Sequence, residues 1–207
     1  MNSAIDKVFD RFGFHVSRET VDKLEIYFNL LNKWQKAINL VSEATLADAP
    51  ERHFFDSAQL LRYIPETDVT LADMGSGAGF PGMVLAILGV KRVHLIESDV
   101  RKATFLREVS RETATPVTIH DKRVESAEIP SIDVFTARAL APLRDLLGFM
   151  ADLSTQGHTA YGLFLKGLNS QEELDQAAKR WAFTHELWPS QTDISGKIIK
   201  ISNLEQK

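Results

Sequence analysis

The stretch Leu71–Gly82, LADMGSGAGFPG, decides how the rest of the chain is organised. Its apolar start is typical of a buried strand, and Gly75, Gly77 and Gly79 then allow a turn in which a ligand can lie against bare backbone. Residues 81–88 predict a helix, whose first N–H groups would face whatever the loop holds. Glycine clusters also form ordinary turns, so the stretch alone leaves a cofactor loop and a structural turn equally open.

The glycines also contain a misleading pattern. Gly77, Gly79 and Gly82 match G-x-G-x-x-G, the dinucleotide-binding fingerprint. That fingerprint places its first glycine directly after the strand, where this chain has Gly75 preceded by Asp73. The better description is D-x-G-x-G-x-G, which resembles the first motif of the Rossmann-like S-adenosylmethionine-dependent methyltransferases. This resemblance makes S-adenosyl-L-methionine the expected cofactor.

A second acid follows the next predicted strand. Residues 93–96 form a short apolar run, and Glu97 closes it eighteen positions after Gly79. A carboxylate at this place can accept both hydroxyls of an adenosine ribose. The structural alternative is a surface acid at a strand end, and the glycine loop upstream favours the ribose contact.

The composition sets outer limits. With 207 residues, 44% of them hydrophobic, the chain has room for one α/β domain and a modest appendage. A net charge of −4 and a pI near 5.9 give no general attraction to nucleic acid, so an RNA contact needs a local basic patch. The absence of cysteine excludes disulfides and thiolate chemistry. A charged amphipathic start, with no apolar run of about 20 residues, predicts a cytoplasmic protein without a membrane span.

The two parts of the chain differ in their periodicity. Residues 1–65 carry helical patterns, including a helix capped by Ser17 and another that starts near Pro50. Strand and helix patterns alternate afterwards, which predicts a doubly wound α/β domain over 66–207. Seven mostly parallel strands are expected, the last two an antiparallel edge pair, at residues 69–72, 93–96, 117–120, 132–135, 159–165, 185–188 and 197–201.

Two cations are expected at the edge where open α/β sheets bind ligands. Arg138 follows the fourth predicted strand, and Lys166 ends the fifth. The structural alternative for Arg138 is an ion pair with Asp145 or Glu125.

Two segments of the N-terminal part hold further candidates. Lys33 and Trp34 place a cation beside an aromatic ring, which suits RNA, although a core tryptophan with a solvated lysine is the commoner outcome. In RHFFDS, helical spacing sets Arg52 beside Asp56 and His53 beside Ser57. A lone helical histidine is usually structural, and no grouping has the spacing of a metal site.

Seven segments in order resemble the bacterial small-subunit (16S) ribosomal RNA guanine-N7 methyltransferases, the glucose-inhibited division protein B family. They are NKWQKAINLVS, RHFFDS, DMGSGAGFPG, LIESDVRKATFLREV, RVES, TARALAPL and FLKG. The resemblance spans about Leu24 to Gly167 and is loose over the last forty residues. It implies an enzyme that methylates N7 of a guanine in 16S rRNA near the decoding region, within the small ribosomal subunit or an assembly intermediate. We expect a cytoplasmic monomer without a metal.

The resemblance and the residue patterns described above together indicate the contacts. Cofactor contacts are expected at Asp73, Gly75, Gly77, Gly79, Phe80, Glu97, Val124, Glu125 and Arg138. RNA contacts are expected at Arg138, Lys166, Lys33 and Trp34. Met74 departs from the pattern, since an aliphatic residue such as Val is expected there.

The implied reaction needs little from side chains. Guanine N7 has a lone pair and no proton, so no general base and no catalytic residue is predicted. The target guanine is expected in an RNA loop or a partly opened structure, with the base stacked on an aromatic ring, for which Phe80 and Trp34 are the candidates. Two alternatives remain: a methyltransferase of the same fold with another substrate, and a non-catalytic module that binds the cofactor or RNA. A nicotinamide dehydrogenase fits poorly, because the glycine pattern is out of phase.

Overall fold

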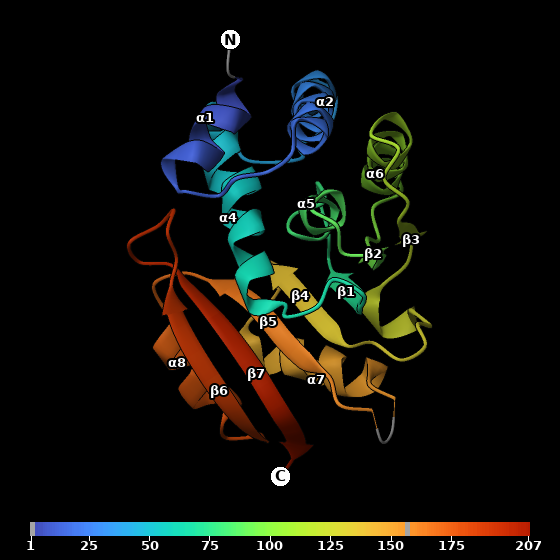
Figure 1. Ribbon diagram of the computed structural model, residues 1–207. Helices are drawn as coiled ribbons and strands as arrows, with labels where there is room; N and C mark the ends of the chain where they lie inside the picture. Colours follow the sequence, from blue (N-terminus) through green and yellow to red (C-terminus); the bar gives the residue numbers. More distant parts are fainter. Residues whose placement is uncertain (1–2, 156–157) are drawn as a thin grey trace.

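A seven-stranded sheet with helices on both faces organises the computed structural model, which describes residues 3–155 and 158–207 (Figure 1). The strand order is β3-β2-β1-β4-β5-β7-β6. The first five strands in this order are parallel, and β7 is antiparallel to both of its neighbours. The predicted α/β fold class, with a mostly parallel doubly wound sheet, is therefore confirmed.

The strands lie close to their predicted positions. Their bounds are β1 Thr70–Met74, β2 Arg92–Ile96, β3 Thr118–His120, β4 Val134–Arg138, β5 Tyr161–Lys166, β6 Trp181–Pro189 and β7 Lys197–Gln206. The last two are longer than expected, because they pair with each other from Trp181 opposite Gln206 to Pro189 opposite Lys197. Cross-strand pairing thus extends these strands beyond their apolar centres.

Helices connect the strands and build the N-terminal part. Their bounds are α1 Ala4–Arg11, α2 Arg18–Gln35, α3 Glu43–Leu46, α4 Asp56–Ala58, α5 Gly82–Ile87, α6 Val100–Glu112, α7 Leu143–Leu153 and α8 Ser170–Ala177, with a short 3₁₀ turn η3 at Val124–Ser126. The predicted cap is present, since the Ser17 hydroxyl accepts a hydrogen bond of 3.1 Å from the Thr20 amide.

The helix expected from Pro50 to Tyr63 is continuous but changes its winding. It begins as a π-helix, η1 (Pro50–Phe55), passes through α4, and tightens into a 3₁₀ turn, η2 (Gln59–Tyr63). Such wide turns are frequent at functional sites because they redirect side chains. Here the wide turn carries Arg52 and His53.

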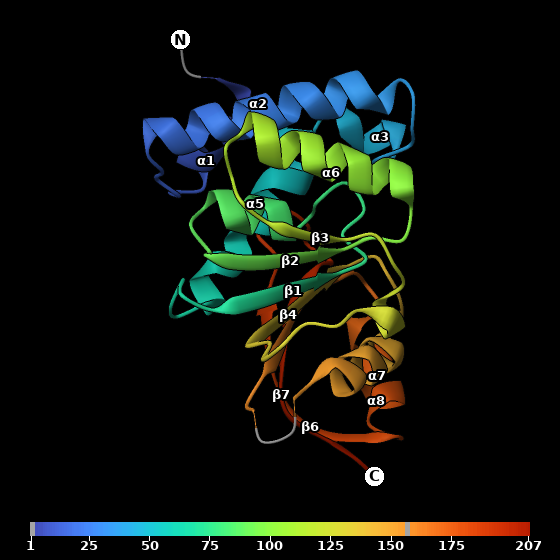
Figure 2. The ribbon, with the colours of Figure 1, turned by 90° about the vertical axis from the view of Figure 1, so that its right-hand side faces the viewer.

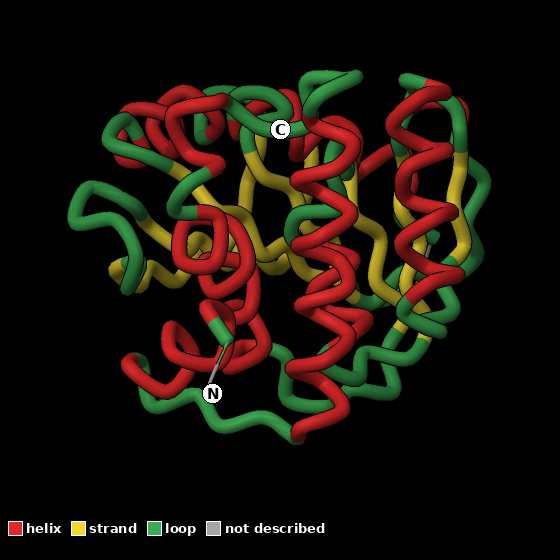
Figure 3. Tube along the Cα trace, turned by 90° about the horizontal axis from the view of Figure 1, so that it is seen from above, coloured by secondary structure: helices red, strands yellow, loops and turns green. Residues whose placement is uncertain are grey.

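The N-terminal helices share a core with the sheet. Helices α1, α2, α5 and α6 lie on one side, and α7 and α8 lie on the other (Figure 2). Seen from above, the helices of the first side overlie the strands (Figure 3). Tyr27 of α2 is fully buried and its hydroxyl donates a hydrogen bond to the Ala78 carbonyl. The first part of the chain therefore contacts the glycine loop directly.

The glycine loop needs glycine for two reasons. Gly75, Gly77 and Gly79 have φ of +65°, +56° and +96°, a region that L side chains rarely adopt. At Gly79 an added Cβ would also lie 2.6 Å from the Tyr27 hydroxyl and 2.9 Å from Met83 Cβ. The loop is thus close-packed on its inner side.

No helix within residues 3–155 and 158–207 has the length and apolar character needed to cross a membrane.

Replacing Gly79 with alanine is expected to destabilise the protein by about 2–5 kcal/mol, because positive φ and overpacking add. Gly148→Ala is the matched control, since this helical glycine of α7 has nothing within 4 Å of the added Cβ. The control is expected to be neutral or to stabilise by up to about 1 kcal/mol. Urea unfolding of both variants measures the difference, and equal effects would contradict the packing described for the loop.

Candidate functional site

A cavity of about 700 Å³ opens at the carboxyl ends of β1, β4 and β5, and its size suits a small ligand. The glycine loop forms one wall through residues 75–78, and residues 138–142 and 165–167 form others. The Pro50–Tyr63 helix and the turn between β6 and β7 close the remaining side. The cavity therefore lies at the sheet edge that the sequence indicated.

Asp73 lies beneath the loop and does not line the cavity. One carboxylate oxygen accepts a hydrogen bond of 2.8 Å from the Thr136 hydroxyl of β4, and the other accepts one of 3.2 Å from the Gly82 amide of α5. Burial raises the pKa of Asp73 to about 6, while these hydrogen bonds oppose the shift. Asp73 thus supports the loop from below.

Glu97 holds the glycine loop from the β2 side. Its carboxylate accepts hydrogen bonds of 2.8 Å from the Gly77 amide and 2.7 Å from the Asp99 amide. Val124 is buried and Glu125 is exposed in the turn after β3, and neither lines the cavity. The predicted cofactor residues therefore form two groups, one on the β2–β3 side of the loop and one in the cavity on the β4 side.

Arg138, the last residue of β4, is held by the Pro50–Tyr63 helix. Its guanidinium lies 3.5 Å from the Asp56 carboxylate and donates a hydrogen bond of 3.1 Å to the Arg52 carbonyl. Burial lowers the pKa of Arg138, and the charge of Asp56 opposes this shift. The partners considered from sequence, Asp145 and Glu125, were wrong because the true partner comes from a helix distant in sequence.

Neither candidate aromatic ring presents an open face to the cavity. Phe80 is only 3% exposed, and Tyr27 and His53 stack on it with ring centroids 5.3 and 5.2 Å away. The expectation that Phe80 stacks on the guanine is therefore wrong, although the residue does line the cavity. Trp34 is half-buried with its ring edge-on to Phe105 at 5.7 Å, as the structural alternative expected.

The two lysines expected to touch RNA differ in their surroundings. The Lys166 side chain is 8% exposed, and its ammonium lies 2.7 Å from both the Glu173 carboxylate and the Ala141 carbonyl. A ligand of Lys166 would have to compete with these partners. Lys33 is exposed on α2, with its ammonium 3.4 Å from the Glu108 carboxylate.

His53 is a buried, neutral histidine. Burial, with help from the charges of Arg138 and Arg52, lowers its pKa to about 3. Its Nε2 lies 2.9 Å from the Thr45 hydroxyl, while Nδ1 is buried without a hydrogen-bond partner among the described residues. Since it has no charge at neutral pH, it acts through packing and a single hydrogen bond.

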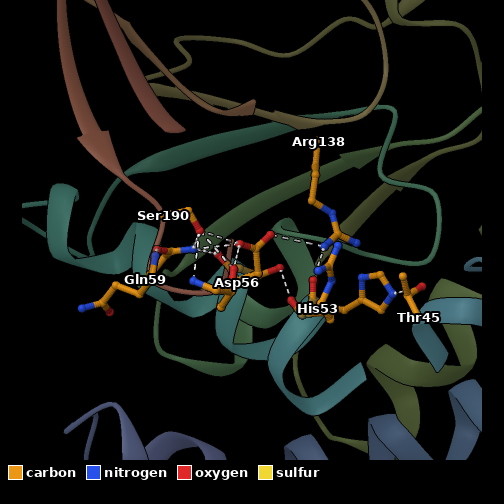
Figure 4. Close-up of polar contacts among 10 residues, drawn as sticks. Thr45, His53, Asp56, Gln59, Arg138 and Ser190 are labelled. Carbon is orange, nitrogen blue, oxygen red and sulfur yellow. Dashed lines mark hydrogen bonds and ion pairs between the residues drawn. The ribbon is translucent and has the colours of Figure 1, made fainter. Parts of the chain in front are cut away.

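A polar network that sequence reasoning missed joins the Pro50–Tyr63 helix to the turn between β6 and β7 (Figure 4). The Asp56 carboxylate accepts hydrogen bonds from Gln59 at 2.8 Å, Thr192 at 2.5 Å and Ser190 at 3.3 Å. The Gln191 amide donates to the Gln59 side chain at 3.0 Å. Asp56 was visible in RHFFDS, but only as a neighbour of Arg52.

Solved structures of other proteins share this fold. A magnesium protoporphyrin IX methyltransferase from Synechocystis with bound SAM gives a TM-score of 0.56 at 10% identity, over 91% of this chain and 98% of that one. A SAM-dependent methyltransferase from Aquifex aeolicus gives a TM-score of 0.54 at 14% identity, over 84% of this chain and 97% of that one. The fold is that of the class I S-adenosylmethionine-dependent methyltransferases.

Sequence comparison then identifies the family. The model of the family described as rRNA small subunit methyltransferase G matches residues 20–197. Two similar proteins are named ribosomal RNA small subunit methyltransferase G. The one from Rhodospirillum centenum is 53% identical over 93% of this chain and 88% of its own length. The one from Rhodospirillum rubrum is 48% identical over 92% of this chain and 94% of its own length. The chain belongs to this family of S-adenosylmethionine-dependent enzymes, which confirms the resemblance and the expected cofactor.

The raised pKa of Asp73 predicts how stability depends on pH. The folded state binds this proton more tightly than the unfolded state, so the contribution of Asp73 to stability falls as the pH rises from 3.8 to about 6. The quantity to compare is the difference in unfolding free energy between the wild type and Asp73→Asn, whose side chain does not titrate. This difference is expected to fall by about 3 kcal/mol between pH 3.8 and about 6. Urea unfolding at several pH values measures it, with the exposed Asp152→Asn as control. A difference that rises with pH would contradict the assignment.

Proposed function

We propose that this chain transfers the methyl group of S-adenosylmethionine to N7 of a guanine in 16S rRNA, as a monomer in the cytoplasm. The proposed substrate form is the small ribosomal subunit or an assembly intermediate. The observation that carries the proposal is the position of the glycine loop, with Glu97 on one side and the cavity that holds Arg138 on the other. An elongated cofactor that crosses this loop would leave part of the cavity for a base.

The residues on the two sides of the loop fit the parts of the cofactor. On the β2 side, Glu97 offers a carboxylate for ribose hydroxyls, and Val124 and Glu125 are the proposed neighbours of the adenine. Across the loop, an added Cβ at Gly77 would meet no atom nearer than 3.9 Å, so this backbone is open to close approach. Arg138 has five N–H donors, more than its contacts with Asp56 and Arg52 use, which leaves donors to orient a carboxylate.

The chemistry agrees with the neutral state of His53. S-Adenosylmethionine supplies an electrophilic methyl group on a positively charged sulfur. Guanine N7 attacks with its lone pair, so no proton has to be removed and no general base is needed. Correct placement of N7 can supply roughly 7–11 kcal/mol of the barrier. The product ring is cationic, and the Asp193 carboxylate in the cavity lining, which accepts hydrogen bonds within its own turn, gives that charge a favourable environment.

We also propose that residues 1–65 are a helical extension of the methyltransferase domain, residues 66–207, and complete its site. Two contacts support this. Tyr27 packs on the glycine loop, and Asp56 holds Arg138 at the end of β4. The sheet and its own connecting helices would leave this side of the cavity open.

Radiolabelled methyl transfer to small ribosomal subunits that lack the endogenous modification tests the reaction. Wild-type protein is expected to label N7 of a guanine, and Gly75→Asp is expected to abolish the label. The reason is that φ at Gly75 is +65°, which L side chains rarely adopt, and that the substitution adds a charged side chain to the loop where it lines the cavity. If calorimetry shows that the protein binds S-adenosylmethionine but no label appears on the subunit, the result would favour a non-catalytic module that binds the cofactor or RNA. Label on another acceptor would favour a different substrate for the same fold.

Glu97→Gln tests the ribose contact. The substitution keeps the shape of the side chain but removes its charge, and hydrogen bonds to charged groups contribute about 1.5–3 kcal/mol. The affinity for S-adenosylmethionine, measured by calorimetry, is expected to fall by about ten- to one-hundred-fold. Glu112→Gln, on the surface of α6, is the control and is expected to bind normally. Unchanged affinity in Glu97→Gln would remove this residue from the proposed site.

A further inference from the structure

Residues 190–196 form the turn that joins β6 to β7. This turn, the rim turn, lies at the mouth of the cavity. It lies at the same edge of the sheet as the glycine loop, because β7 is antiparallel to β5 with Lys197 opposite Lys166. In Figure 1 the turn projects beyond the ends of β6 and β7, beside α4. The rim-turn residues that line the cavity are Ser190, Thr192, Asp193 and Gly196.

Ile194, at the tip of the rim turn, is 100% exposed. An isoleucine in water forgoes the free energy that its burial would contribute, about 1.5–3 kcal/mol. Single exposed apolar residues are common, but here several gather at one edge. Among the described residues six large apolar side chains are exposed, and three of them lie in loops after parallel strands or in the rim turn: Leu140 after β4, Leu168 after β5 and Ile194.

Hydrogen bonds hold the rim turn in one conformation. The Asp193 carboxylate accepts from the Ser195 amide at 2.9 Å and from its hydroxyl at 2.7 Å. The Ser190 amide donates to the Gly196 carbonyl at 2.9 Å, and the network of Asp56 and Gln59 in Figure 4 ties the turn to the Pro50–Tyr63 helix. The exposed isoleucine is therefore presented on a fixed support, which lowers the entropic cost of binding a partner.

The charges around Ile194 indicate what it contacts. Arg52, which is exposed, and Lys197, which is half-buried, line the same part of the cavity. Two of the nearby acids are paired with cations, Asp56 with Arg138 and Glu173 with Lys166, while the Asp193 carboxylate accepts hydrogen bonds within the turn itself. The rim turn is close to two cations, since the charge of Arg52 acts on Asp193 and Lys197 directly follows the turn. An apolar tip with cations nearby suits a partner with flat apolar faces and a negative backbone, which is an RNA strand.

The reaction requires N7 of the target guanine to be accessible. In an A-form helix, N7 of guanine lies in a deep, narrow major groove that protein side chains do not reach. The base must therefore leave its stack before it is methylated, at the cost of lost stacking. Apolar side chains inserted between base steps compensate for this loss in other nucleic-acid-binding proteins.

We propose that the rim turn is an RNA-binding element whose Ile194 inserts beside the target guanine and takes its place in the stack. This inference rests on the proposed function. It assigns to the β6–β7 turn a role separate from cofactor binding, and it makes Ile194 an RNA contact of the bound substrate.

Ile194→Ala tests the proposal, with Ile26→Ala on α2 as the matched control, since Ile26 is 39% exposed away from this edge. Methyl transfer to undermethylated small subunits is expected to lose at least about ten-fold in kcat/KM in Ile194→Ala, the effect that one apolar contact supports. The affinity for S-adenosylmethionine is expected to stay at the wild-type value. Ile26→Ala is expected to match the wild type in both measurements.

A second readout reports the insertion directly. With 2-aminopurine placed next to the target guanine in 16S rRNA that is assembled into small subunits, wild-type protein is expected to raise the fluorescence by unstacking the neighbour, and Ile194→Ala is expected to raise it less. Equal transfer rates and equal fluorescence in the two proteins would overturn the proposal. Weaker cofactor binding in Ile194→Ala that accounts for the lost activity would overturn it as well. Failure of the wild type to label the subunit would instead contradict the proposed function.

Discussion

The site depends on one buried carboxylate. Asp73 joins the end of β1 to β4 through Thr136, and to the first turn of α5 through the Gly82 amide. The N-terminal end of a helix is a favourable place for this negative charge, which offsets part of the cost of burying it. Because both ends of the loop are held in this way, its glycines present backbone outwards between Glu97 on one side and the cavity on the other.

The N-terminal helices form the parts of the site that the sheet itself does not provide. Tyr27 packs on Phe80 and its hydroxyl meets the Ala78 carbonyl, so α2 sets the inner surface of the loop. The Pro50–Tyr63 helix contributes Asp56, whose two oxygens face different partners: Arg138 on one side and the rim turn on the other. A single carboxylate thereby couples the cation at the end of β4 to the turn at the cavity mouth.

Local sequence was enough for much of this structure. Asp73 and the positive φ of the loop glycines follow from residues within one short stretch, and the apolar runs that became β1 to β5 are short and bounded by turns. The family followed from ordered motifs, and the cofactor from the first of them. Strand length was predicted less well at β6 and β7. The pairing of eight residues of β6 with β7, and not the apolar centres of the two strands, sets where they end.

What the amino-acid sequence determined by itself was the α/β architecture, the glycine loop and the acid after β2, because each depends on backbone conformation and periodicity within a few residues. Only the tertiary structure decided which side chains meet. Asp56 and Ser190 are 134 positions apart, and their contact exists because β6 ends, and the antiparallel β7 begins, at the edge that bears the Pro50–Tyr63 helix. The packing of the Pro50–Tyr63 helix against the sheet likewise pairs Arg138 with Asp56 and covers Phe80. Contacts of this kind join residues that are distant in the chain, so they leave no local pattern in the sequence.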